Sequence, residues 1–119
     1  MKIYLAKIIY RIICGNGNHT PQFDEQLRLI HAEDDFHAFQ KARLLGEKEE
    51  DSFLNHSQKP VLWKFIDVVE IHLLNDLADG LELYSQIKEE DDAIPYIEGI
   101  QKRAAMLFEN CLKNNIFMN

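Results

Sequence analysis

Charged and aromatic side chains that could hold an anionic ligand occur on three stretches with the pattern of β-strands. The candidates are Lys7, Arg11, Trp63, Lys64, Glu82 and Tyr84, with Glu70 in the same stretch as Trp63. If they converge on one sheet face, the cations could bind a carboxylate or another small anion, and Glu82 could act as an acid–base group. The alternative is cross-strand ion pairing at an interface, worth about 0.2–1 kcal/mol for each pair. We favour ion pairing, and for Trp63 a place in the core.

No other motif in the sequence points to catalysis or to a metal. None of the histidines is spaced as in HxH, HxxxH or HExxH; they are His19, His31, His37, His56 and His72. The acidic runs 49–51 and 89–92 lack the alternating carboxylates of a calcium loop. We therefore expect no metal, no cofactor and no catalytic residue, which leaves enzymatic activity undecided but disfavoured.

The two cysteines and the apolar N-terminus indicate the compartment. Cys14 and Cys111 have no second Cys at metal-ligand spacing, so we expect reduced thiols. A disulfide between them would require Cα atoms closer than about 7 Å, which the sequence leaves open. The apolar run from Ile3 is interrupted by Lys7 and Arg11, unlike a signal peptide. No segment reaches the roughly 18–20 apolar residues that cross a bilayer, and we expect a cytoplasmic protein without a membrane partner.

Length and composition predict one folded domain over residues 1–119, with a mobile tail at about 113–119. Hydrophobic residues make up 46% of the chain, enough for a core. The formal net charge of −7 disfavours nucleic acid as a partner, because phosphate binding requires clustered Lys and Arg. An acidic surface would instead suit a basic protein partner.

Four strands are predicted from apolar patterning. Residues 2–14 and 61–73 are apolar on both alternating faces, which is typical of strands in the middle of a sheet. Residues 23–32 alternate more weakly, as an edge strand does, and follow a Gly-, Asn- and Pro-rich turn. Residues 81–87 form the fourth predicted strand, after a turn ending at Gly80, while residues 47–59 are predicted to be polar and partly loop.

Two helices complete the predicted fold. The first is capped by Asp34 or Asp35 and ends at Gly46 or frays on to Asp51. Its apolar stripe is Ala38, Phe39, Ala42 and Leu45. The second has Pro95 in its first turn, and its stripe is Ile97, Ile100, Ala104, Leu107 and Cys111. The prediction is an α+β fold, β-β-α-β-β-α, with a four-stranded antiparallel sheet of order 2-1-3-4 and both helices on one face.

Two helices cover one face of such a sheet, so the other face needs a cover. A large apolar patch on a monomer usually marks an interface, and we predict a symmetric homodimer packed through this sheet face. The alternative is that the C-terminal residues Ile116, Phe117 and Met118 fold back over it.

Several of these segments resemble a family of small bacterial proteins known as domain of unknown function 4288. The resemblance is carried by the strand 4–7, the strand 23–30, the pair Ala38 and Ala42, and the motifs 63–68 (WKFIDV) and 79–85 (DGLELYS). It covers about residues 3–88 and leaves out the last helix. Gln86 stands where the resemblance implies an Arg, and the resemblance implies no activity.

The sequence therefore predicts a non-enzymatic, homodimeric protein-interaction module, with an inhibitor or immunity-type role as one form of it. The alternative is a small anionic-ligand-binding or enzymatic domain, with its site around Lys7, Arg11, Glu82 and Tyr84.

Overall fold

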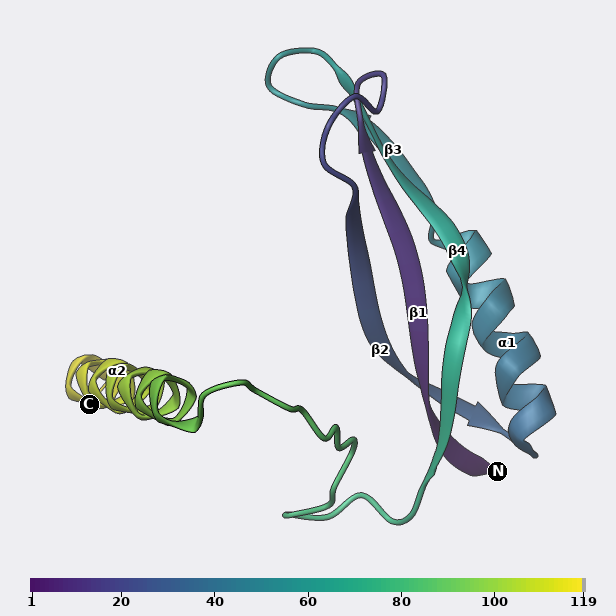
Figure 1. The fold of residues 1–119 in the computed structure, drawn as a ribbon. Coiled ribbons are helices and arrows are strands. Elements are labelled where there is room, and N and C mark those ends of the chain that lie inside the picture. Colours follow the sequence, from purple (N-terminus) through teal and green to yellow (C-terminus); the bar gives the residue numbers. More distant parts are fainter. Residues whose placement is uncertain (119) are drawn as a thin grey trace. The chain divides into compact units, whose positions relative to one another are not determined.

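The computed structural model describes the backbone of residues 1–118 and the side chains through Asn115. The elements in order are β1 (Lys2–Cys14), β2 (Gln22–Ala32), α1 (Asp35–Lys48), β3 (Asp51–Leu54), β4 (Pro60–Leu74) and α2 (Ala93–Met118) (Figure 1). They fall into two units, Met1–Leu83 and Tyr84–Asn119, which are described separately. The predicted element order and four-stranded antiparallel sheet are confirmed. That the whole chain is one domain stays a prediction.

β1 lies inside the sheet, as its two apolar faces predict. It pairs antiparallel with β2 on one side and with β4 on the other, so that Lys7 lies between Leu27 and Glu70. β2 is an edge strand, as predicted. Two register shifts in the β1–β4 ladder, after Lys7 and after Ile9, add local twist to the sheet.

The fourth strand is not where the sequence predicted it. The sheet order is β2-β1-β4-β3, and residues 81–87 form no strand. Its place is taken by β3, which a tight turn folds back onto β4. In that turn the Asn55 side chain accepts hydrogen bonds from the backbone N–H of Ser57 (2.9 Å) and Lys59 (3.0 Å). These bonds to Asn55 close the hairpin and place β3 beside residues Pro60 to Trp63 of β4.

α1 begins and packs as predicted, and it ends later than Gly46. Asp34 is the N-cap, and its carboxylate accepts a hydrogen bond from the backbone N–H of His37 at 2.8 Å. The helix continues to Lys48 with Gly46 buried inside it. A Cβ at Gly46 would collide with the Phe65 ring, so glycine is required there by packing rather than to end the helix.

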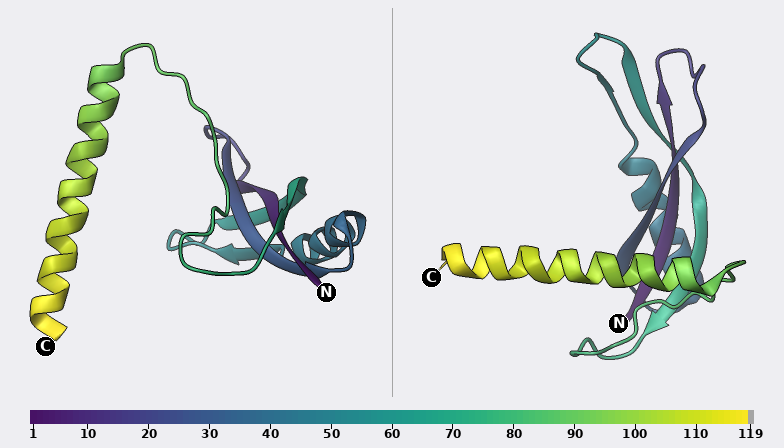
Figure 2. Two further views of the ribbon diagram at one scale, coloured as in Figure 1. Left: turned by 90° about the horizontal axis from the view of Figure 1, so that it is seen from below. Right: turned by 60° about the vertical axis from the view of Figure 1, so that its left-hand side comes forward.

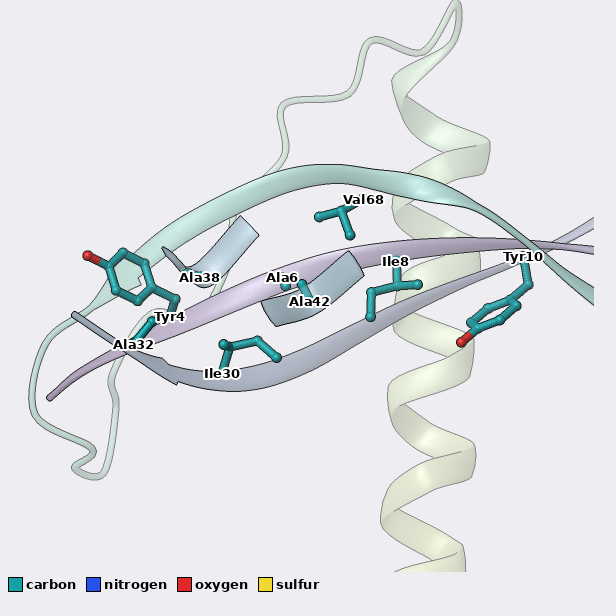
Figure 3. Packing of buried hydrophobic residues seen from close by; sticks show 9 residues of the cluster. All are labelled: Tyr4, Ala6, Ile8, Tyr10, Ile30, Ala32, Ala38, Ala42 and Val68. Carbon is teal, nitrogen blue, oxygen red and sulfur yellow. The ribbon is translucent and has the colours of Figure 1, made fainter. Parts of the chain in front are cut away.

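The core lies between α1 and one face of the sheet (Figures 2 and 3), here called the helix face. Even-numbered β1 residues point into it, and Ala38 and Ala42 let α1 approach closely. Its buried members are Tyr4, Ala6, Ile8, Tyr10, Ile30, Ala32, Ala38, Ala42 and Val68. The opposite side of the sheet, here called the outer face, carries the odd-numbered β1 residues, the β2 residues opposite them and, from β4, residues that include Lys64, Glu70 and His72.

The second unit contains α2, with Pro95 in its first turn as predicted. The Asp92 side chain accepts a hydrogen bond from the backbone N–H of Ile94 (3.3 Å) at the helix start. The helix runs to Met118. The predicted placement of this helix on the sheet, and the mobility of residues 113–119, stay predictions. The alternative in which Ile116, Phe117 and Met118 cover the outer face falls outside the described side chains.

Candidate functional site

Lys7 is the centre of an ion-pair cluster on the outer face. Its Nζ lies 3.0 Å from the Glu25 carboxylate on β2 and 3.5 Å from that of Glu70 on β4. Glu70 also lies 3.4 Å from the His72 ring. The Lys7 side chain is only 23% exposed, so these carboxylates compensate a cation that has lost much of its water. Cross-strand ion pairing was expected among these residues without a stated register, and here it joins Lys7 to Glu70 and Glu25 within one chain.

Arg11 and Lys64 lie directly opposite each other in the same face. Like charges in such a pair are destabilising. The Arg11 Nε is buried and has no hydrogen-bond partner among the described residues. On the other side, Arg11 is paired with Phe23 of β2. The two cations could therefore hold an anion. It would accept a hydrogen bond from the unused Arg11 Nε–H and offset the repulsion between Arg11 and Lys64.

The structure does not bring Glu82 and Tyr84 to this face on a strand. Glu82 follows the turn at Asp79–Gly80, where the Ala78 carbonyl accepts from the Leu81 N–H at 3.1 Å. Tyr84 is the first residue of the second unit. The turn is present as predicted, but the strand expected to carry the two side chains into the sheet is absent. Their part in binding stays a prediction.

Trp63 lies on the helix face, away from Lys64. It is paired with Ile12 across the β1–β4 ladder and packs against the core, as predicted. Its indole N–H donates a hydrogen bond of 3.1 Å to the Asp24 carboxylate. Its ring stacks with Phe53 of β3 at a centroid distance of 5.9 Å. Trp63 therefore fixes β3 to the sheet and does not share a site with the outer-face cations.

A polar ladder on the helix face of β2 was not predicted from the sequence. Gln26 donates to Asp24 (2.7 Å) and accepts from Arg28 (3.0 Å), and Arg28 forms a 2.7 Å ion pair with Glu49. The hydrogen bond from Arg28 is the main cause that lowers the pKa of Glu49. The ladder covers the part of the helix face beyond the end of α1. The alternation of polar residues at 22, 24, 26 and 28 is the signal that could have indicated it.

Tyr10 closes the core beside this ladder. Its hydroxyl donates a buried 2.8 Å hydrogen bond to the Gly46 carbonyl. Burial raises the pKa of Tyr10, and the Glu49 carboxylate adds to the effect. A phenol held neutral by burial is suited to packing rather than to proton transfer near neutral pH.

An open hollow of about 900 Å³ lies among the loops at the far end of β1. His19 lines it, but both ring nitrogens are engaged: Nε2 accepts from the Cys14 N–H (2.9 Å), and Nδ1 pairs with the Thr20 carbonyl (2.8 Å). That pattern requires the neutral tautomer with its proton on Nδ1. His19 therefore stabilises the turn and is not a ready metal ligand.

The described residues include no cluster of metal-ligating side chains and no disulfide. Among residues 1–118, no group of three or more His, Cys, Asp or Glu side chains is placed to hold a metal ion. Cys14 and Cys111 are both free thiols. No helix within the described range is both long and apolar enough to cross a membrane.

Comparison with known proteins gives a family and nothing further. Residues 3–85 match the family model described as domain of unknown function (DUF4288). No curated protein and no solved structure matches the chain. The match includes the whole sheet and α1, and α2 lies beyond it.

Proposed function

The chain belongs to the DUF4288 family, and from that premise we propose that it is a non-enzymatic, cytoplasmic module that acts by protein association. Its first partner is a second copy of itself, bound through the outer face of the sheet. The net charge of −7 supports a basic protein as a further partner, by electrostatic steering.

The observation that carries this proposal is the apolar row on the outer face of β2. Phe23, Leu27 and Leu29 are 56%, 48% and 47% exposed, and they point to the same side because strand side chains alternate. Beside them on β1 lie Ile3 and Ile9, which are only partly buried. α1 covers the other face of the sheet. Glu25 separates Phe23 from the adjacent Leu27 and Leu29, and exposed apolar side chains grouped on one sheet face are typical of an interface.

The charge at the centre of the outer face is compatible with burial against a second copy. Lys7 is already matched by Glu25 and Glu70 within its own chain. Burying such a group costs less than burying an unpaired charge. A two-fold symmetric pair requires one self-complementary patch, and an apolar row with its central cation neutralised meets that requirement.

Sedimentation equilibrium at micromolar concentration tests the proposal. Leu27→Asp places a carboxylate in the apolar row, and the lost burial of a leucine is worth about 1.5–3 kcal/mol. We expect the dimer dissociation constant to rise at least about tenfold. The matched control is Phe36→Asp on α1, where an exposed aromatic (64%) lies away from the outer face.

Two results would contradict the proposal. One is a wild-type protein that sediments only as a monomer across the micromolar range. The other is an equal loss of dimer for Leu27→Asp and Phe36→Asp, which would indicate general damage instead of a defined interface. Far-UV circular dichroism of both variants checks that the fold is retained.

A second candidate function is binding of a small anion, supported by the unused Arg11 donor opposite Lys64. Titration with inorganic phosphate, followed by ¹H–¹⁵N correlation spectra, should shift backbone resonances around residues 11 and 64. Arg11→Gln should abolish those shifts. Absence of any saturable shift in the wild type would rule this candidate out for phosphate.

A further inference from the structure

The second unit consists of one long helix and the segment that leads to it. α2 has 26 residues, and its large apolar side chains, including Ile97, Ile100 and Leu107, are exposed. Helices of this kind gain most of their stability from packing an apolar face, because intrinsic propensity alone leaves them marginal in water. The apolar face of α2 therefore requires a partner.

The spacing of that face identifies the kind of partner. Successive residues of the stripe are separated alternately by four and three positions: Ala93, Ile97, Ile100, Ala104, Leu107 and Cys111. This is the a/d pattern of a heptad repeat, with Ala93, Ile100 and Leu107 at d and Ile97, Ala104 and Cys111 at a. A 3.5-residue period keeps one seam facing a second helix along the whole contact, with a left-handed supercoil.

We propose that α2 pairs with α2 of a second copy as a parallel, two-stranded coiled coil. Ile97 at a position a and Leu107 at a position d match the preference of parallel dimers, whereas Ile100 at d, together with Ile97 at a, is a combination more typical of three or four strands. The interaction surface is separate from the outer face of the sheet, and it does not depend on the function proposed above.

The flanking positions favour the parallel orientation. In a parallel pair, Tyr96 lies next to Gln101 of the second helix, Arg103 next to Phe108, and Asn110 next to Asn115, so no like charges meet. The Arg103–Phe108 contact also brings a guanidinium to an aromatic ring. An antiparallel pair that matches Ile97 with Leu107 would instead bring the two copies of Arg103 together at the two-fold axis.

Disulfide trapping in the full chain tests both the pairing and its direction. In a parallel pair the two Cys111 side chains share one layer of the seam, within the roughly 7 Å between Cα atoms that a disulfide requires. With Cys14→Ser to remove the other thiol, mild oxidation should give a covalent dimer through Cys111. The control moves the thiol to the opposite side of the helix, with Cys14→Ser, Cys111→Ser and Glu109→Cys, and we expect at least a tenfold lower yield.

A second pair of variants separates seam packing from random collision. Ile100→Asp puts a carboxylate in the seam and should lower the Cys111 dimer yield at least tenfold. Met106→Asp, at an exposed position outside the seam (55% exposed), should leave the yield unchanged. Equal yields for thiols at 109 and 111, or no effect of Ile100→Asp, would overturn the proposal. Leu27→Asp alters only the sheet, so failure of one interface is distinguishable from failure of the other.

Discussion

Replacing Gly46 with alanine should destabilise the first unit, although the same change in most helices is stabilising. Gly46 is buried in α1, and the Phe65 ring occupies the space where a Cβ would stand. Phe65 in turn packs edge-on against Tyr10, with ring centroids 6.0 Å apart. The ring therefore cannot withdraw without disturbing the core.

Two opposing terms set the size of the effect. Alanine stabilises a helix interior by about 1 kcal/mol relative to glycine. Forcing a methyl group into a well-packed core costs about 1–3 kcal/mol. We expect a net loss of about 1 kcal/mol, which lowers the Tm of a unit of this size by roughly 4–8 °C.

Gly99→Ala in α2 is the matched control, because a Cβ at Gly99 has nothing within 4 Å. It should raise the helicity of α2 without touching the first unit. Urea unfolding followed by tryptophan fluorescence reports on the first unit alone, since the only tryptophan, Trp63, lies there. The free energy of unfolding from this probe should fall for Gly46→Ala and stay unchanged for Gly99→Ala.

A second substitution should rescue the variant. Phe65→Leu removes the ring atoms that meet the new Cβ, so Gly46→Ala together with Phe65→Leu should be more stable than the sum of the single changes implies. A coupling free energy of about 1 kcal/mol is expected for residues in direct contact. A Gly46→Ala variant as stable as the wild type, or additive single changes, would refute the assigned role of Phe65.

Three further predictions concern the cap, the edge of β4 and the buried phenol. Asp34→Ala removes the N-cap acceptor and should lower the unfolding free energy, measured by thermal denaturation, by about 0.5–2 kcal/mol. Asp34→Asn should retain most of the wild-type stability. Hydrogen bonds from Arg43 (2.9 and 3.0 Å) lower the pKa of Asp67; this stabilisation is present above the unfolded pKa of about 3.9 and is lost as the pH falls through the lower folded pKa. The urea midpoint of Asp67→Asn should therefore change less with pH across that acid range than that of the wild type. Tyr10→Phe leaves the Gly46 carbonyl unsatisfied at a cost of about 1–3 kcal/mol, and because the folded pKa of Tyr10 is raised, it should also remove the wild-type loss of stability above about pH 10.

The sequence predicted the features that depend on local pattern. β1 and its place inside the sheet followed from two apolar faces, and the Asp34 cap followed from side-chain chemistry at a helix start. That β1 and β4 are neighbours followed because both were expected to be interior strands, whereas the register that places Lys7 opposite Glu70 and Arg11 opposite Lys64 was left open. These predictions needed only patterning and adjacency.

The sequence analysis failed on the fourth strand. Residues 81–87 carry an apolar pattern but form no strand, whereas β3 is placed beside Pro60 to Trp63 by the turn at Asn55, whose side chain closes a hairpin. The ladder from Asp24 to Glu49 was missed for a related reason. Arg28 joins the ladder through Glu49, the residue that follows α1, so whether a polar residue on β2 faces water or a network depends on where α1 ends.

The two proposed interfaces would reinforce each other within one pair of chains. The chain between Leu74 and Ala93 contains no helix or strand, and fully extended it could span about 60 Å. If the outer faces of two copies bind, their α2 helices become tethered neighbours at high effective concentration, which suits a seam with two alanines that would pair weakly alone. If both interfaces form between the same two chains, the assembly stays dimeric as the protein concentration rises. Engagement of different copies by the two interfaces would instead give open chains whose mass grows with concentration.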